Sequence, residues 1–341
     1  MRTALLVTCI GTLLVVPTVM SPADPVDVPA TRVTARHSTE LQPRRWSLHE
    51  VSRPSSASFQ LRVGDLPVPL RVMALTVLPG EEVEITGRAA DAGDLVATTG
   101  GGLLRGIGEA RWVWRAPDEV GFHAVQVVSM ARADTVDLTL MVARPATEVV
   151  GGALRGYAIG AYRARPASMR AAYDPPRGFI EAASEYHDVL VSPNFRLDQF
   201  LCKQPGDVRY VVLSTALLVK LETLLAAVND AGYPTPSLVV MSGFRTPAYN
   251  RAIGNTTDFS RHLWGDAADV YVDRDGDGVM DDIDGDGRRD LADARWLAAL
   301  AEEMMAEPRP GLQPGGLGVY RASAAHGPFV HIDARGARAR W

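Results

Sequence analysis

The chain has 341 residues, of which 47% are hydrophobic and 22% are charged, and its formal net charge is −5. This length predicts about two domains, and the balanced composition argues against a disordered chain, a collagen-like repeat and a protein with many membrane spans. The net negative charge is opposite to the broad basic surface that binding to a phosphate backbone requires, so we expect no nucleic-acid partner.

The first residues are typical of an export signal. Arg2 precedes an apolar run over residues 4–20, which leads to the small residues Ser21-Pro22-Ala23. We therefore predict a signal peptide over residues 1–23, a periplasmic or secreted location, and no stable membrane span after cleavage. The alternative is an uncleaved N-terminal membrane anchor, because a run of this length lies at the lower limit of what can cross a bilayer.

Residues 24–53 are rich in Pro, Ser, Thr and Arg without an apolar period, which predicts a linker. Over residues 54–145, short segments alternate apolar and polar side chains with the period of a β-strand. These segments are 59–63, 82–85, 112–114, 123–127 and 136–140. Because each strand has one apolar face, two sheets must meet to bury those faces. The pattern predicts an N-terminal all-β domain, an Ig-like sandwich.

Residues 146–341 change to mixed periodicities, which predicts a C-terminal α+β domain. The predicted elements are a helix from Asp207 to Gly232, a buried strand over 238–241, and a helix that Asp290 caps and that ends before Pro308.

Three stretches of this second domain, 242–246, 260–269 and 326–333, carry the residues of interest for chemistry. The last two together contain three histidines and three aspartates. Two neutral imidazoles and one carboxylate are the ligand set of a catalytic zinc that keeps a fourth position for water. His262 and Asp269 lie seven residues apart, so a loop must bring the histidine back against the strand that holds the aspartate. Gly265 supplies the backbone freedom for such a return.

The motifs Ser-Gly-Phe-Arg-Thr, then Ser-x-His-x-x-Gly-x-Ala-x-Asp, then His-Ile-Asp on an apolar strand, resemble the zinc D-alanyl-D-alanine carboxypeptidase and murein endopeptidase family. The family shares its fold with the hedgehog signalling domain, and the resemblance covers about residues 191–335. It implies a zinc D,D-carboxypeptidase-like domain in which His262, Asp269 and His331 bind Zn²⁺. It also implies that Arg245 faces the substrate carboxylate or the developing oxyanion. Ser260, which opens the middle motif, is a further substrate-binding candidate.

The catalytic base has no obvious candidate. Many family members place Glu or Asp three residues before the last zinc histidine, and here that position is Pro328, which cannot transfer a proton. His326 is a candidate acid/base or oxyanion partner, and a solvated loop histidine is the alternative. Asp333 is expected to orient a neighbour or to cap a turn.

An acidic insert over residues 273–290 resembles the front half of an EF-hand loop and the calcium repeats of dockerin and thrombospondin type. It predicts a Ca²⁺ site, because such a density of carboxylates repels itself unless cations neutralise it. The predicted ligands are Asp273, Asp275, Asp277, the carbonyl of Val279 and, at the twelfth position, Asp284. A solvated acidic loop is the alternative.

These motifs predict an exported zinc metallopeptidase that hydrolyses D-amino-acid-containing peptide bonds of peptidoglycan stem peptides with metal-activated water. The alternative is a non-catalytic zinc-bearing module that binds cell wall or protein, and Pro328 keeps that alternative open. A third hypothesis, a structural calcium-stabilised surface protein, leaves the motifs around Arg245 and His331 unexplained.

Overall fold

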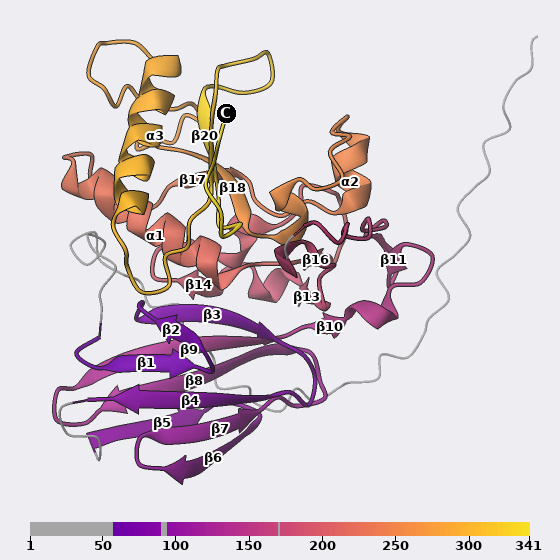
Figure 1. The fold of residues 1–341 in the computed structure, drawn as a ribbon, viewed down its shortest axis with the longest axis vertical. Coiled ribbons are helices and arrows are strands. Elements are labelled where there is room, and N and C mark those ends of the chain that lie inside the picture. Colours follow the sequence, from indigo (N-terminus) through magenta and orange to yellow (C-terminus); the bar gives the residue numbers. More distant parts are fainter. Residues whose placement is uncertain (1–56, 90–93, 170) are drawn as a thin grey trace, which may run out of the picture. The chain divides into compact units, whose positions relative to one another are not determined.

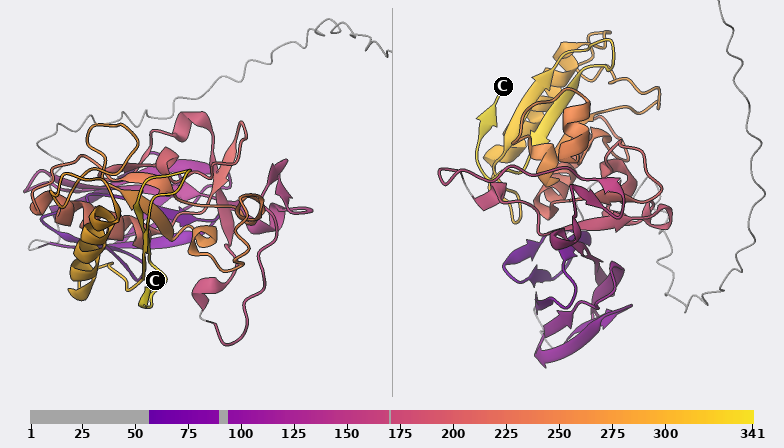
Figure 2. Two further views of the ribbon diagram at one scale, coloured as in Figure 1. Left: turned by 90° about the horizontal axis from the view of Figure 1, so that it is seen from above. Right: turned by 90° about the vertical axis from the view of Figure 1, so that its right-hand side faces the viewer.

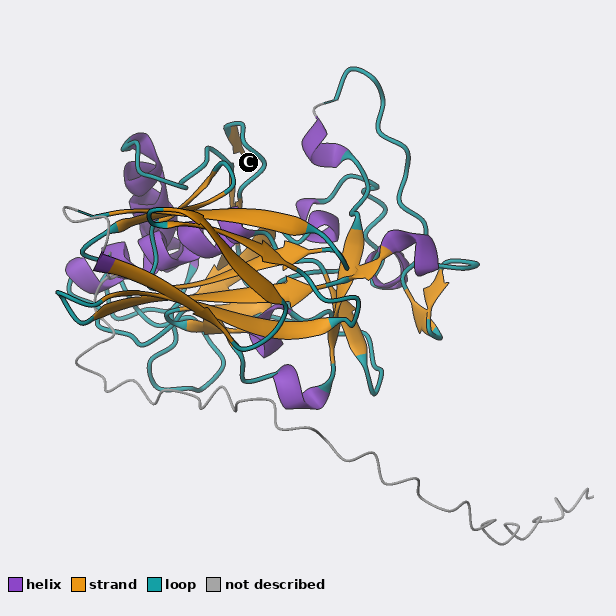
Figure 3. Cartoon of the chain, turned by 90° about the horizontal axis from the view of Figure 1, so that it is seen from below, coloured by secondary structure: helices purple, strands orange, loops and turns teal. Residues whose placement is uncertain are grey.

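Nine strands between residues 60 and 142 form two β-sheets in the computed structural model (Figures 1 and 3). The first sheet has the order β2-β1-β4-β7-β6 and the second β3-β9-β8-β5, and only β3 and β9 pair in parallel within them. The strands are β1 (Gln60–Val63), β2 (Leu66–Val68), β3 (Val72–Val77), β4 (Glu82–Arg88), β5 (Leu95–Thr99), β6 (Leu103–Gly108), β7 (Arg111–Arg115), β8 (Gly121–Ser129) and β9 (Asp134–Val142).

The structure describes residues 57–89, 94–169 and 171–341, and all of them belong to one compact unit. The predicted signal peptide, residues 1–23, and the predicted linker, residues 24–53, lie outside the described residues. Within the described ranges, none of the helices combines the length and apolar character that a membrane crossing needs.

The two sheets bury their apolar faces against each other. In β1, Leu61 and Val63 are buried while the residues between and before them are exposed. They share one hydrophobic cluster with Trp114 of the same sheet and with Val125 and Leu138 of the other. The five segments predicted as strands coincide with strands of the structure, except that Phe59 precedes β1. The Ig-like character of this arrangement stays a prediction.

Four strands were not predicted, and each has a physical reason. β3 is a continuous apolar run, because Met73 and Leu75 face the core between the sheets while Ala74 joins the core of the C-terminal region. β6 is glycine-rich and largely exposed at the edge of its sheet, so it shows no apolar face. β2 has only three residues, and β5 carries Val96 at an exposed position, so neither sequence shows an apolar–polar period.

The C-terminal region is built around a five-stranded sheet of order β17-β18-β20-β19-β21 (Figures 1 and 2). Its elements are β17 (Val239–Ser242), β18 (Ala267–Tyr271), β19 (Gly316–Tyr320), β20 (Phe329–Asp333), β21 (Ala339–Arg340), α1 (Thr215–Asp230), α2 (Pro247–Ala252) and α3 (Leu291–Ala306). Smaller sheets pair β10 (Arg144–Pro145), β13 (Gly178–Ala182) and β16 (Arg209–Val211), then β11 (Ala153–Leu154) with β12 (Tyr157–Ala158), and β14 (Leu190–Ser192) with β15 (Phe195–Arg196). The 3₁₀-helices are Ala146–Glu148, Ala171–Tyr173, Ser184–Tyr186, Leu197–Phe200 and Arg261–Trp264.

The two faces of this sheet carry different side chains. Val330 and Ile332 of β20 and Val270 of β18 lie in one hydrophobic cluster with residues of α1 and α3. Figure 1 shows α3 beside this sheet and close to α1. Because strand side chains alternate, His331 of β20 and Asp269 of β18 lie on the opposite face. α1 and α3 therefore cover the apolar face of the sheet, and the polar face with His331 and Asp269 lies on the other side.

The helix predicted from Asp207 was wrong at its start. Residues Arg209–Val211 form β16, whose backbone pairs with β13, so they are not free to begin a helix. α1 instead begins at Thr215 after Ser214, and Gly232, with φ 95°, follows its end as expected. The cap predicted for the last helix is confirmed, because the Asp290 carboxylate accepts a hydrogen bond from the Ala292 backbone N–H at 2.8 Å.

Candidate metal centre

The register of the sheet places four positions in one row. Ser242 of β17 pairs with Asp269 of β18, Asp269 pairs with His331 of β20, and His331 pairs with Gly318 of β19. Side chains at paired positions point to the same face of a sheet. Asp269 and His331 are therefore held side by side by backbone hydrogen bonds, although 62 residues separate them.

His262 reaches this row from the 3₁₀-helix Arg261–Trp264. Gly265 is the C-cap residue of this helix. Gly265 has φ 64°, and a Cβ atom there would overlap the carbonyl oxygen of Val212. The buried pair of Arg261 and Asp266, with Nε 2.9 Å from Oδ1, holds the two ends of the turn together. Glycine is required here by a left-handed backbone in a closed space, which is more specific than the flexibility that the sequence predicts.

Three ligand atoms converge at this place. His262 Nε2 lies 3.2 Å from Asp269 Oδ1 and 3.2 Å from His331 Nδ1, and the last two atoms are 2.9 Å apart. Zinc bonds of about 2.0–2.1 Å at tetrahedral angles separate neighbouring ligand atoms by roughly 3.3 Å. The three atoms thus match one face of a zinc tetrahedron, and all three side chains are buried.

The outward nitrogen of each imidazole has its own partner. His262 Nδ1 lies 2.7 Å from the carbonyl oxygen of Gly243, to which it can only donate, so Nε2 turns its lone pair to the centre. His331 Nε2 lies 3.3 Å from Asp333 Oδ2, which leaves Nδ1 facing the centre. Metal-binding histidines usually have such second partners, because these fix the tautomer and the ring orientation.

The pKa directions fit a cation-binding site. Burial lowers the pKa of His262, which keeps this imidazole neutral. Burial alone would raise the pKa of Asp269, but the His262 and His331 rings outweigh it and hold that pKa well below its usual range. Burial also opposes charge on His331, yet its hydrogen bonds to Asp269 and Asp333 raise its pKa. A metal ion would take the place of the proton that this group attracts.

Residues 193–280 match the family model described as Peptidase M15. This match supports the M15 zinc peptidase family and with it a zinc-dependent peptidase, in agreement with the predicted resemblance at family level. The matched M15 region contains Arg245, His262 and Asp269 and ends before His331. No curated protein and no solved structure matches the chain.

Asp333 supports the candidate metal centre from beside His331. Its fully buried carboxylate accepts hydrogen bonds from the Gly316 backbone at 2.8 Å and from Arg335, whose Nε lies 2.9 Å from each oxygen. The Nζ of Lys220 donates to the Asp333 carbonyl at 2.6 Å. The sequence predicts an orienting role for Asp333 and misses Lys220. The one available signal was composition, since Lys203 and Lys220 are the only lysines among 35 basic residues.

Arg245 contacts the centre through Asp269. Its Nη2 donates to Asp269 Oδ2 at 2.6 Å and its Nε to Ser242 Oγ at 2.8 Å, so Oδ1 of Asp269 is left for a metal. The guanidinium thus lies beside the centre, as predicted, and its contact with substrate stays a prediction. Ser260 directly precedes the 3₁₀-helix that carries His262, and its hydroxyl makes no capping hydrogen bond.

His326 belongs to the loop between β19 and β20. Its Nδ1 lies 2.8 Å from the Gly327 carbonyl oxygen, and its ring packs edge-on against Phe329 at a centroid distance of 4.9 Å. In the described part of the chain, the group of converging ligand atoms contains His262, Asp269 and His331 and not His326. An acid/base role of His326 therefore stays a prediction.

The acidic insert contributes carboxylates to two groups, the second of which also contains Asp293 of α3. The first group is Asp273, Asp275 and Asp281, and the second is Asp282, Asp284 and Asp293. Asp284, predicted to close the first loop, thus lies in the second group.

Arg289 pairs with Asp277 and also donates to Asp275 Oδ2 at 3.0 Å, so an internal cation already neutralises part of this charge. The predicted carbonyl ligand Val279 lies in an exposed turn. Ca²⁺ binding stays a prediction without support from these contacts.

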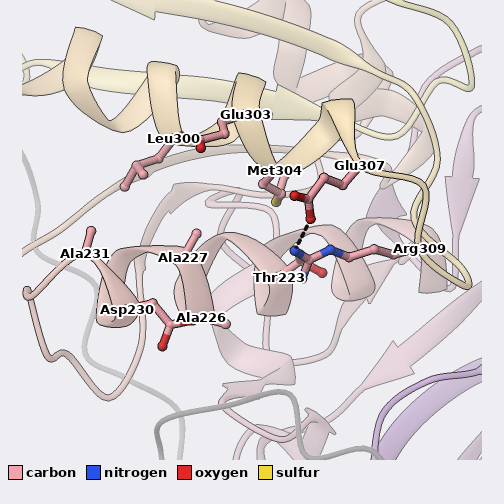
Figure 4. Close-up of a pocket in the computed structure, with 10 residues that line it drawn as sticks. All are labelled: Thr223, Ala226, Ala227, Asp230, Ala231, Leu300, Glu303, Met304, Glu307 and Arg309. Atoms are coloured by element: carbon pink, nitrogen blue, oxygen red, sulfur yellow. Dashed lines mark hydrogen bonds and ion pairs between the residues drawn. The ribbon is translucent and has the colours of Figure 1, made fainter.

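A hollow between α1 and α3 is separate from the candidate metal centre (Figure 4). Its lining is Thr223, Ala226, Ala227, Asp230, Ala231, Leu300, Glu303, Met304, Glu307 and Arg309. Arg309 Nη2 donates to Glu307 Oε2 at 2.7 Å across its rim. The candidate metal ligands His262, Asp269 and His331 are not among its lining residues.

Proposed function

We propose that the chain is an exported zinc metallopeptidase, periplasmic or secreted, that hydrolyses D-amino-acid-containing peptide bonds in peptidoglycan stem peptides. The observation that carries the proposal is the convergence of His262, Asp269 and His331, with ligand atoms 2.9–3.2 Å apart, in a chain that matches peptidase M15. The substrate class rests on the resemblance of the three motifs to D,D-carboxypeptidases and endopeptidases.

A zinc ion held by these residues would supply a bound water of lowered pKa and would polarise the scissile carbonyl. The chain's own contribution is to hold the ligands in place before substrate arrives. Gly243 and Asp333 set the tautomers of the two histidines, so neither ring has to reorient. Arg245 holds the second oxygen of Asp269 and adds a permanent positive charge, which suits an anionic stem peptide.

The identity of the proton-transfer group follows partly by elimination. Pro328 cannot serve, and Asp333 is unsuitable because both of its oxygens already accept hydrogen bonds from Arg335. His326 is the remaining titratable side chain of the 326–333 stretch that is free of the metal centre. We therefore propose His326 as the acid/base, in a loop that would have to approach the substrate.

The test is to incubate the purified zinc-loaded protein with muropeptides and to analyse the products by mass spectrometry. Release of D-alanine or cleavage of a cross-link supports the proposal, and His262→Ala must abolish it. His326→Gln should lower kcat and remove one limb of the pH profile while zinc content is kept. Muropeptides that stay intact with the zinc-loaded wild type contradict the proposed function.

The second candidate is a non-catalytic zinc-bearing module that binds cell wall or protein. Pro328, which stands where many family members have a carboxylate, favours it. The same experiment separates the two functions, because a binding module would retain muropeptides without cutting them.

A further inference from the structure

The row of the sheet that holds the metal ligands ends in a glycine. Gly318 of β19 lies directly opposite His331 of β20. A Cβ atom at Gly318 would overlap the indole nitrogen of Trp341 and would lie 2.6 Å from its Cε2. The Trp341 indole thus fills the space where a side chain at 318 would stand, on the same face of the sheet as the candidate ligands.

Trp341 is fixed in this place by several contacts. Its backbone N–H donates to the Leu317 carbonyl and its own carbonyl accepts from Val319, both at 3.3 Å, which continues the pairing of β21 with β19. The indole Nε1 donates to the hydroxyl of Tyr320 at 2.6 Å, and the Arg335 guanidinium lies 5.2 Å from the ring centroid. A side chain that is held before binding loses little conformational entropy when a ligand arrives.

The indole nevertheless remains open to solvent beside a candidate ligand. Its ring centroid lies 5.1 Å from that of His331, yet Trp341 is 51% exposed. A tryptophan with a purely structural role would normally be largely buried. The neighbouring Tyr320 is 38% exposed and stacks on Phe329 at 4.7 Å, so the aromatic surface continues toward the loop that holds His326.

We propose that Trp341 is a substrate-contacting residue whose exposed indole packs against the aliphatic side chain of the peptide residue next to the scissile bond. This inference rests on the proposed function. The indole and the His331 ring are direct neighbours, with centroids 5.1 Å apart, so the residues that flank the scissile bond would come within reach of the indole. The methyl side chains of alanine residues are the apolar groups of matching size for a flat aromatic face.

The test compares Trp341→Ala and Trp341→Phe with the wild type on a muropeptide that the wild type cleaves. We expect Trp341→Ala to raise KM about three- to tenfold, which is the range of a single aromatic contact, with a smaller effect for Trp341→Phe. Zinc content should stay at the wild-type value in both variants. Met130→Ala, which removes an exposed apolar side chain of the sandwich, is the control and should leave KM unchanged.

The outcomes separate this inference from the proposed function. A wild type that cleaves muropeptides while Trp341→Ala has unchanged KM and kcat overturns the contact alone. Loss of zinc in both Trp341→Ala and Trp341→Phe would make the indole a structural support of His331, which also overturns the proposal. If the zinc-loaded wild type does not cleave muropeptides, the result contradicts the proposed function and therefore also this inference.

Discussion

Asp269 and His331 occupy paired positions on neighbouring antiparallel strands, and Asp269 Oδ1 lies 2.9 Å from His331 Nδ1. The backbone register of β18 and β20 places the two side chains next to each other, so little side-chain movement is needed to bring the two atoms together. His262 completes the triad from a turn that Gly265 closes. The candidate centre is therefore preorganised by backbone geometry.

Asp269→Asn tests the triad directly. The amide keeps the shape of the carboxylate but removes its charge, so we expect zinc affinity to fall by more than about 100-fold and peptidase activity to be lost. Competition with a chromogenic chelator measures the affinity. Asp188→Asn, at a carboxylate whose side chain is 81% exposed, is the matched control and should bind zinc as the wild type does. Equal affinities in both variants would show that Asp269 is not a ligand.

Asp333→Asn tests the orientation of His331. The variant weakens the acceptor that faces His331 Nε2 and breaks the ion pair with Arg335, so we expect zinc affinity to fall about 10- to 100-fold without loss of the fold. Chelator competition and a thermal unfolding curve are the two measurements. Wild-type affinity in a folded variant contradicts the orienting role.

Gly265→Ala should destabilise the protein severely. The new Cβ would overlap the Val212 carbonyl in addition to straining a left-handed backbone, so we expect a loss of more than about 2 kcal/mol in the free energy of unfolding. Gly254→Ala is the matched control, because Gly254 has φ 81° with open space around it and should lose only about 1 kcal/mol. Chemical denaturation of both variants compares the two losses, and similar values would refute the steric argument.

Lys220 should make the stability of the protein change with pH in the alkaline range. Burial lowers the pKa of Lys220 to about 8 from the usual 10.5, so the folded state loses this proton at a lower pH than the unfolded state. Between pH 8 and pH 10.5 the unfolded chain therefore binds more protons at Lys220 than the folded chain does. Because of this difference, the contribution of Lys220 to the free energy of unfolding rises with pH over this range. The Tm of the wild type minus that of Lys220→Met should therefore increase from pH 8 to pH 10. A constant difference would show that the buried amine does not titrate there.

The acidic insert supplies a metal-dependent prediction that is independent of zinc. If Ca²⁺ binds at the loop that begins with Asp273, its addition to the chelator-treated protein should raise the Tm. At a Ca²⁺ concentration 100 times the dissociation constant, the free energy of unfolding should rise by about 2.7 kcal/mol. Asp273→Asn should abolish the rise, and Mg²⁺ at the same concentration is the control ion. An unchanged Tm would leave the insert as a solvated acidic loop.

The local pattern of the chain was enough to place several elements. Alternation located five strand segments of the sandwich, and the polar Asp290 before an apolar repeat located the start of α3. Alternation failed for β3, because that strand is covered on both sides, and helical spacing failed at Arg209–Val211, because strand pairing there overrides it. Local rules work where one face of an element is solvated, and they fail where a distant segment supplies the second partner.

The sequence alone determined the residue types of the candidate metal centre, because histidines and a carboxylate at these spacings, together with the resemblance that they carry, point to His262, Asp269 and His331. Only the tertiary structure decided which nitrogen of each ring faces the centre, that Lys220 donates to the Asp333 carbonyl, and that Trp341 stands beside His331 above Gly318. These relations depend on the register between strands far apart in the chain. That register is set by backbone pairing and by burial against α1 and α3, neither of which leaves a local signal in the sequence.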